Sequence, residues 1–468
     1  MRSFGRLPIC IFFGLLAYTN ISGQSRNSGE KPNFILIVAD DLGYGDLGFT
    51  GSNQIKTPHI DELARKGTIF TQGYVSSPVC SPSRAGFITG VNQVEFGHDN
   101  NLPRKAEPGF DSEYLGLPLS QKTIADHLKP FGYVSGLIGK WHLGYEEQFH
   151  PLNRGFDEFW GYTGGGHDYF SANDEGKGYL SPIESNYRTP QSLTYLTDDK
   201  GSECVDFITR HRQSPFFLFA SFNAPHTPMQ AKEEDLKLYA HIKNKKRRTY
   251  AAMVHRLDVN VGRIMAAVKK EGLENNTIIV FISDNGGPTD TNASLNAPYR
   301  GQKGIVLEGG IHVPFIIKGA EIIPSGQTLG EMVTALDLAP TFLTLASGNV
   351  ADQKYFTGVN LMPYLTGKVT AVARQELLWR FTISTAIRQG DWKLIRMPDR
   401  LPMLYHLPTD ISEEKDVSLE NLAKTKELLH KLGEWDVNLP HPVFVEGAEW
   451  KRRQLSLYDK TYQLEQPR

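Results

Sequence analysis

Four short runs of mostly apolar residues stand out along the first two thirds of the chain. They span residues 34–39, 133–138, 216–222 and 277–283. Such runs, which lack regular alternation with polar residues, are typical of parallel strands that are buried on both faces. Elsewhere apolar residues recur at helical spacing, and these stretches are residues 250–271 and 332–345. The pattern predicts an α/β domain with a mixed, mostly parallel sheet flanked by helices.

The pattern changes near residue 350. Four short strands are predicted after this point, over residues 376–381, 385–388, 392–397 and 403–407. Short runs separated by turn residues are typical of an antiparallel sheet, and the helical spacing of residues 421–435 adds a helix that could cover it. The sequence therefore predicts an α/β domain over residues 30–350 and a small C-terminal α+β subdomain over residues 351–468.

Residues 1–23 have the features of a secretory signal peptide. Two arginines precede an apolar run over residues 7–18, and the small residues Ser22 and Gly23 follow it. The run is too short to span a bilayer. We expect an exported protein, periplasmic or secreted, with no transmembrane segment after the signal is removed.

Composition narrows the classes of function. The 468 residues are 40% hydrophobic and 22% charged, an ordinary balance for a globular protein. The formal net charge of -2 argues against nucleic acid as a partner. Beyond the predicted signal only Cys80 and Cys204 remain, so the fold must rely on its core and not on a disulfide framework.

Polar side chains follow each of the four predicted parallel strands. They are Asp40 and Asp41, Lys140 and His142, His226, and Asp284 and Asn285. Ligands of α/β sheets gather at the carboxyl ends of the strands, so we expect these side chains to share one edge. Carboxylate and amide oxygens favour Ca²⁺ or Mg²⁺ over a soft metal. The sequence has no His–Glu–His cluster, which argues against a zinc hydrolase.

The segment over residues 80–90 combines a reactive residue with the expected start of a helix. Pro82 suits a first helical turn and Ser81 is the expected N-cap, which would set Cys80 beside the N-terminus of the helix, where anions bind. Arg84 adds a cation. The alternative is an ordinary buried cysteine. A tyrosine-phosphatase loop is excluded, because it needs Arg six positions after Cys and Gly86 is found there.

This segment resembles the signature of the type I, formylglycine-dependent sulfatases, Cys-x-Pro-Ser-Arg followed by Thr-Gly, and the rest of the chain agrees in order. The further matching motifs are Val38-Ala39-Asp40-Asp41, Gly139-Lys140-Trp141-His142-Leu143-Gly144, Ala224-Pro225-His226, Ser283-Asp284-Asn285-Gly286, Lys303-Gly304 and Glu308-Gly309-Gly310. The resemblance implies an alkaline-phosphatase-like fold and hydrolysis of sulfate esters. One position departs from many relatives, which carry Arg where this chain has His312.

The resemblance also implies a cofactor and a set of roles. One Ca²⁺ ion would be held by Asp40, Asp41, Asp284, Asn285 and formylglycine at position 80, which a sulfatase-maturing enzyme makes from Cys80. The implied catalytic residues are Cys80 (as formylglycine), Arg84, Lys140, His142, His226 and Lys303. Hydrated formylglycine would attack sulfur and form a formylglycine-sulfate intermediate. His226 would protonate the leaving oxygen, and His142 would take the proton that lets sulfate depart.

The substrate is expected to be a sulfated carbohydrate. The chain is similar in style to secreted bacterial polysaccharide sulfatases, including those that act on algal ulvan or carrageenan. Candidate sugar contacts from polar and glycine-rich loops are His98, Asn100, His167, Asp168 and Arg300. Three alternatives stay open: a glycosaminoglycan sulfatase, a phosphodiester or phosphonate hydrolase of the same superfold, and a sulfated-glycan binding protein without activity.

Overall fold

The computed structural model describes residues 31–172, 181–187, 192–349, 354–369 and 374–462. The predicted signal peptide over residues 1–23 lies outside these ranges. Within them, no helix is long and apolar enough to cross a membrane.

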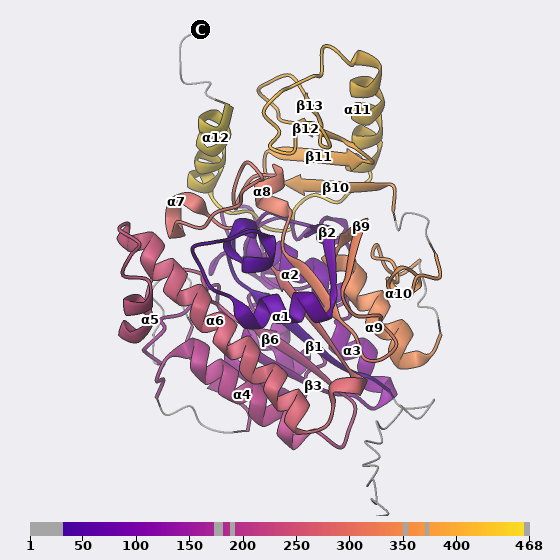
Figure 1. The fold of residues 1–468 in the computed structure, drawn as a ribbon. Coiled ribbons are helices and arrows are strands. Elements are labelled where there is room, and N and C mark those ends of the chain that lie inside the picture. The colour runs from indigo at the N-terminus through magenta and orange to yellow at the C-terminus, as the bar shows by residue number, and fades with distance from the viewer. Residues whose placement is uncertain (1–30, 173–180, 188–191, 350–353, 370–373, 463–468) are drawn as a thin grey trace, which may run out of the picture.

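A sheet of nine strands runs through the larger part of the molecule, counted over the described residues (Figure 1). The strands are β1 (Asn33–Ala39), β2 (Thr68–Tyr74), β3 (Val134–Lys140), β4 (Glu158–Tyr162), β5 (Glu184–Ser185), β6 (Phe216–Ser221), β7 (Thr277–Ser283), β8 (Phe315–Lys318) and β9 (Gln327–Thr334). Their order is β5-β4-β3-β6-β1-β7-β8-β2-β9. Only β5 and β8 run antiparallel to their neighbours. The predicted fold class is confirmed.

Helices cover both faces of this sheet. One face carries α1 (Pro58–Lys66), α4 (Leu196–Arg210) and α6 (Lys245–Lys270), and the other carries α2 (Cys80–Thr89), α3 (Ile124–Leu128) and α9 (Leu338–Ser347). Successive strand side chains point to opposite faces. In β1, Ile35 and Ile37 therefore join the core on the α6 side, while Phe34 and Leu36 join the core on the α2 side. A strand with an apolar environment on both sides needs the continuous apolar run seen in the sequence.

The C-terminal part forms a second, antiparallel sheet of four strands. They are β10 (Glu376–Phe381), β11 (Ser384–Gln389), β12 (Trp392–Arg396) and β13 (Met403–His406), in that order. Helix α11 (Leu422–Asp436) buries Leu428 and Leu432 against this sheet, as predicted for a covering helix. Helix α12 (Ala448–Tyr462) stands apart from α11, above α7 (Thr289–Asn292) (Figure 1). The domain boundary near residue 350 stays a prediction, because residues 350–353 lie outside the described ranges.

Three local predictions were wrong or incomplete. The helical spacing over residues 332–345 predicted a single helix, but the stretch contains parts of two elements. Strand β9 ends at Thr334 and helix α9 begins at Leu338. Strand β2 was not predicted, and its pattern of buried and partly exposed residues gives no continuous apolar run. Helix α12, in the tail beyond Leu439, was not predicted either.

A buried network of charges joins the two sheets. Lys393 on β12 contacts Glu308 at 2.8 Å and Glu413 at 2.9 Å, and these side chains are at most 2% exposed. Tyr74 and His312 bind the second oxygen of Glu308, Oε2, at 2.6 and 3.0 Å. Burial raises the pKa of Glu413 to about 7, while Lys393 acts to lower it. Lys393 is therefore a buried cation that two buried acidic side chains share.

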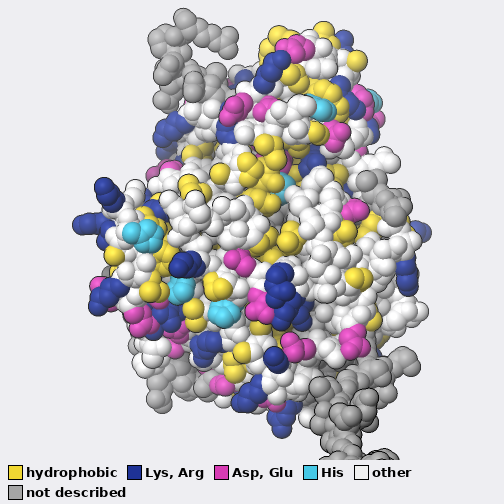
Figure 2. All heavy atoms as spheres, in the orientation of Figure 1, with side chains coloured by type: hydrophobic (Ala, Val, Ile, Leu, Met, Phe, Trp, Pro, Cys, Tyr) yellow, Lys and Arg dark blue, Asp and Glu magenta, His cyan; other side chains and the backbone are white. Residues whose placement is uncertain are grey.

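Unlike the buried network, the surface charges do not form one cluster. On the face drawn in Figure 2, Lys and Arg side chains are interspersed with Asp and Glu over α4 and α6. On this face the two signs of charge are mixed, so no extended area of one sign is present there.

Replacing Lys393 by Met should destabilise the protein, since it leaves two buried carboxylates without their cation. We expect a loss of about 3–5 kcal/mol in the free energy of unfolding, measured by urea denaturation. Lys415→Met removes an exposed pair with Glu420 and should change that free energy by at most about 1 kcal/mol. Equal effects of the two substitutions would contradict the role given to the buried network.

Candidate active site

The carboxyl ends of β1, β3, β6 and β7 meet at one edge of the large sheet. The residues there are Asp40 and Asp41 after β1, Lys140 at the end of β3, His226 in the turn after β6, and Asp284 and Asn285 after β7. Each of them is less than 10% exposed. The structure thus brings the polar groups of four strands into one buried cluster, with the N-terminal end of α2 beside it.

Cys80 lies inside this cluster as the first residue of α2. Val79 is the N-cap and its side chain makes no capping bond, so the expectation that Ser81 caps the helix was wrong by two positions. Pro82 still falls in the first turn, where its missing N–H leaves no bond unmade. The Cys80 sulfur lies 3.4 Å from Asp40 Oδ1 and accepts from Lys303 Nζ at 3.0 Å. Burial raises the pKa of the Cys80 thiol, so an unmodified cysteine stays protonated and is a poor nucleophile.

Asp40 and Asp41 are each paired with a lysine. Lys140 Nζ lies 2.7 Å from Asp40 Oδ2, and Lys303 Nζ lies 2.7 Å from Asp41 Oδ1. Burial acts to raise the pKa of Asp40, but the surrounding cations, Lys140 foremost, hold it well below its usual value. Burial acts to lower the pKa of Lys303, but Asp41 and its other anionic neighbours raise it well above normal. Asp40 and Lys303 therefore keep their charges in the folded protein.

Arg84 connects α2 to the ends of β6 and β7. Its Nε donates to Asp284 Oδ2 at 3.0 Å, and its NH1 group donates to Ser221 Oγ at 2.7 Å. Burial and the neighbouring charge of Asp40 raise the pKa of Asp284 to about 6, while Arg84 acts to lower it. The guanidinium is fully buried, so its orientation is fixed before any substrate binds.

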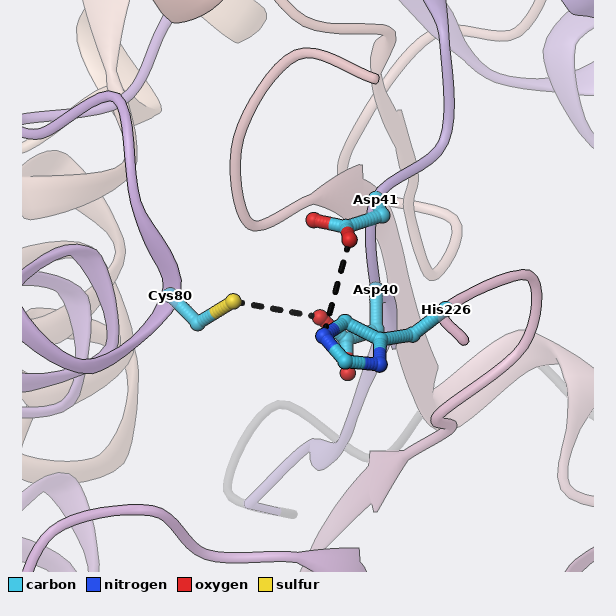
Figure 3. Close-up of side chains that lie close together, drawn as sticks. All are labelled: Asp40, Asp41, Cys80 and His226. Carbon is cyan, nitrogen blue, oxygen red and sulfur yellow. Dashed lines mark hydrogen bonds and ion pairs between the residues drawn. The ribbon is translucent and has the colours of Figure 1, made fainter. Parts of the chain in front are cut away.

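Two histidines flank the cluster. The Nδ1 atom of His226 lies 2.6 Å from the Thr227 carbonyl oxygen, which leaves Nε2 directed at Asp41 Oδ2, 3.6 Å away (Figure 3). The Nδ1 atom of His142 is buried without a hydrogen-bond partner among the described residues. Burial lowers the pKa of both imidazoles, and Lys140 and Arg84 lower that of His142 further. His142 is therefore neutral at neutral pH and can accept a proton.

The residues present fit a hard cation. Among the described residues, Asp40, Asp41, Cys80 and His226 offer ligand atoms that all lie within 4.8 Å of one another (Figure 3). Asn285 Nδ2 donates to Asp41 Oδ1 at 2.7 Å, and Asn285 Oδ1 is buried and has no hydrogen-bond partner within the described structure. A cation is the natural partner for an orphaned carbonyl oxygen beside carboxylates. This group shares Asp40, Asp41 and position 80 with the predicted ligands, and Asp284, whose Oδ2 lies against Arg84, stays a predicted ligand.

A cavity of about 440 Å³ opens over the cluster. Its floor contains Cys80, Asp41 and Lys303, and His142 and His226 line its sides. The sequence did not single out Asn101, Glu446, Trp450 or Arg453, which also line it. Three of these come from the C-terminal tail, and only the folded structure brings that tail to the sheet edge.

The predicted sugar contacts His98 and Asn100 do not reach this cavity. His98 is fully buried, its Nε2 lies 2.7 Å from Ser81 Oγ, and burial lowers its pKa to about 3. Asn100 is also buried and is held by Thr382 Oγ1 at 2.7 Å. These two side chains therefore support the loop that contacts α2, and their contact with substrate stays a prediction.

The other three predicted contacts also lie outside the cavity lining. His167 is buried, with Nδ1 2.7 Å from the Asp168 carbonyl oxygen, and its contact with a sugar stays a prediction. Asp168 Oδ1 accepts from the backbone of Phe170 and Ser171, which shapes its own turn. Arg300 is partly buried. Contact of Asp168 or Arg300 with a sugar stays a prediction.

Comparison with known proteins gives consistent matches. Residues 32–348 match the family model described as Sulfatase. Steryl-sulfatase of Rattus norvegicus is 33% identical over 438 residues, which is 77% of this chain and 74% of that protein. N-acetylgalactosamine-6-sulfatase of Rattus norvegicus is 32% identical over 407 residues, 83% of this chain and 74% of that protein. The chain spans 64% of Arylsulfatase J of Mus musculus, at 33% identity.

A solved structure is similar over nearly the whole fold. It is the crystal structure of Ps i-CgsB in complex with k-i-k-neocarrahexaose, which is 36% identical to this chain with a TM-score of 0.83. The match covers 93% of this chain and 100% of that one.

Proposed function

The chain belongs to the sulfatase family, whose members are sulfuric ester hydrolases, and we propose that it removes sulfate from an algal polysaccharide of the carrageenan or ulvan type. In this proposal Cys80 is oxidised to formylglycine by a sulfatase-maturing enzyme, and the protein is exported after removal of residues 1–23. The observation that carries the proposal is the buried cluster around Cys80, where Lys140, Lys303 and Arg84 surround the nucleophile position.

The cations bind and stabilise sulfate. Lys140, Lys303 and Arg84 are already held by carboxylates, so they need little reorganisation when charge builds up on the sulfate oxygens. Stabilisation of the transition state by preorganised charges in a buried site is usually the largest single contribution to catalysis. A bound Ca²⁺ ion, held by Asp40, Asp41, Asp284, Asn285 and position 80, would add a further positive charge and acidify the attacking hydroxyl.

The two histidines have different roles in proton transfer: His226 is the acid and His142 is the base. His226 donates from Nε2 to the departing sugar oxygen, because its Nδ1 is occupied by the Thr227 carbonyl. The anionic substrate favours the protonated imidazole and so opposes the effect of burial on its pKa. His142, neutral in the buried site, accepts a proton from the hydroxyl at position 80. Formylglycine supplies two hydroxyls on one carbon when hydrated, one for attack and one whose deprotonation releases sulfate.

The choice of substrate rests on one solved relative. Ps i-CgsB is 36% identical over nearly the whole fold, and its structure holds a neocarrahexaose. A glycosaminoglycan is the second candidate, since N-acetylgalactosamine-6-sulfatase is 32% identical to this chain. A phosphodiester or phosphonate substrate has no comparable support among these relatives.

The proposal is tested with protein co-expressed with a sulfatase-maturing enzyme. We expect sulfate release from carrageenan or ulvan oligosaccharides to exceed release from glycosaminoglycan oligosaccharides, and an aryl sulfate to be hydrolysed faster than the matched aryl phosphate.

His226→Ala should lower kcat/KM about 10²–10⁴-fold for a sugar sulfate but much less for 4-nitrophenyl sulfate, whose oxygen leaves without a proton.

The control for that experiment is His430→Ala, because His430 is largely exposed on α11. This variant should leave both rates unchanged. Preference for the phosphate ester would contradict the proposed reaction, and preference for glycosaminoglycans would contradict the proposed polysaccharide. An equal loss on both sulfates in His226→Ala would contradict its role as the acid.

Calcium should be required for both activity and full stability. We expect chelation to abolish sulfate release and Ca²⁺ to restore it. Saturating Ca²⁺, at about 100 times its Kd, should stabilise the fold by about 2.7 kcal/mol, measured as a rise in Tm. Asp41→Asn should remove most of this rise. A melting temperature that does not respond to Ca²⁺ in the wild-type protein would contradict the proposed ion.

A further inference from the structure

A second cavity continues outward from the one that contains Cys80. It has a volume of about 920 Å³ and shares Leu102, Glu446, Trp450 and Arg453 with the inner cavity of about 440 Å³. Since the same four side chains border both spaces, the two form one groove that leads from the nucleophile along α12. We call this second space the outer groove. A small aryl sulfate would occupy only the inner cavity.

Glu446 lies at the junction and is incompletely satisfied. Its Oε1 accepts from Asn101 Nδ2 at 3.4 Å, whereas its Oε2 is buried and has no hydrogen-bond partner among the described residues. Burial raises the pKa of Glu446 to about 7. A buried carboxyl oxygen without a donor is costly unless a ligand supplies one. The hydroxyl groups of a sugar are donors of this kind.

Trp450 supplies an aromatic surface at the same junction. Its ring packs against the backbone at Gly304, next to Lys303, where an added Cβ would lie 3.4 Å from the indole, and the Arg453 guanidinium lies over the ring at 5.8 Å from its centroid. Its Nε1–H is buried and has no acceptor within the described structure. An indole pairs a broad apolar face with one hydrogen-bond donor, which suits the C–H face and the oxygens of a pyranose ring.

The outer groove carries charges of both signs. Arg104, Arg453 and Lys460 line it together with Glu107 and Asp290. Figure 2 shows side chains of both signs on the face where α12 approaches α7. A purely anionic ligand such as inorganic sulfate would not match such a surface. A chain of sugars that alternates hydroxyls with occasional sulfates would, because carboxylates accept from hydroxyls while arginine and lysine bind sulfate.

We propose that Glu446, Trp450 and the outer groove form a binding subsite for the sugar units beside the one that loses its sulfate. The enzyme would accordingly act on a chain of several sugars in preference to a single sulfated sugar. This inference rests on the proposed function, since the sulfate ester of the same chain must occupy the inner cavity.

The test compares substrates of increasing length with a small reference substrate. Oligosaccharides of two, four and six sugars are prepared from the polysaccharide that proves the best substrate, and 4-nitrophenyl sulfate is the reference. We expect kcat/KM to rise about tenfold or more from two to six sugars, a gain of about 1.4 kcal/mol. The rise should come mainly from a lower KM.

Two variants and one control test whether Trp450 and Glu446 bind the neighbouring sugar units. Trp450→Ala and Glu446→Gln should each remove most of the gain with chain length and lower kcat/KM for the hexasaccharide about tenfold more than for the aryl sulfate. Glu446→Gln is nearly isosteric, so it keeps the test informative if Trp450→Ala is unstable. Arg452→Ala is the matched control, because Arg452 is exposed on α12 and lines neither cavity. It should change neither rate.

The outcomes separate the subsite from the reaction. A kcat/KM that is independent of chain length, or equal losses on both kinds of substrate in both variants, would overturn the subsite while leaving the sulfatase reaction intact. A matured wild-type protein that hydrolyses neither the aryl sulfate nor any oligosaccharide would overturn the proposed function and the subsite with it.

Discussion

Buried carboxylates at the edge of the sheet lie against buried cations, and the rest of the site depends on this pairing. Asp40 is bound by Lys140 and Asp41 by Lys303, each at 2.7 Å, while a third carboxylate holds the guanidinium of Arg84. A single charge in such a place would cost several kcal/mol. The arrangement is stable only because the opposite charges arrive together from different strands and from α2, which requires the whole parallel sheet to be formed.

The same pairing explains how the site can recognise an oxyanion ester. The cations are held in place by carboxylates that also suit a metal ion, so positive charge is concentrated around Cys80 before substrate arrives. Burial raises the pKa of the Cys80 thiol, which makes an unmodified cysteine a poor nucleophile, and the proposed reaction therefore relies on the oxidised form of this residue. In the proposed reaction the oxygen nucleophile at position 80 would lie among these cations.

The sequence predicts most of this site because its residues follow parallel strands. Strand β7 was predicted over residues 277–283 and is found there, since both of its faces are buried and its residues are apolar throughout. The ends of the predicted strands then give the positions of the polar site residues.

Side chains that depend on long-range packing could not be placed in this way. His98 looked like a substrate contact in a polar loop, yet the fold buries it under α2. Trp450 lies on a helix whose mostly polar residues gave no apolar pattern, and only the folded chain brings it over Gly304.

The central claim is that activity resides in the oxidised form of residue 80, surrounded by these paired charges. The most direct measurement compares the fraction of protein that carries formylglycine at position 80, determined by peptide mass spectrometry, with the specific sulfatase activity of the same preparations. Co-expression with different amounts of the maturing enzyme provides the range. The account predicts a straight line through the origin. Full activity in a preparation whose position 80 is entirely cysteine would contradict it.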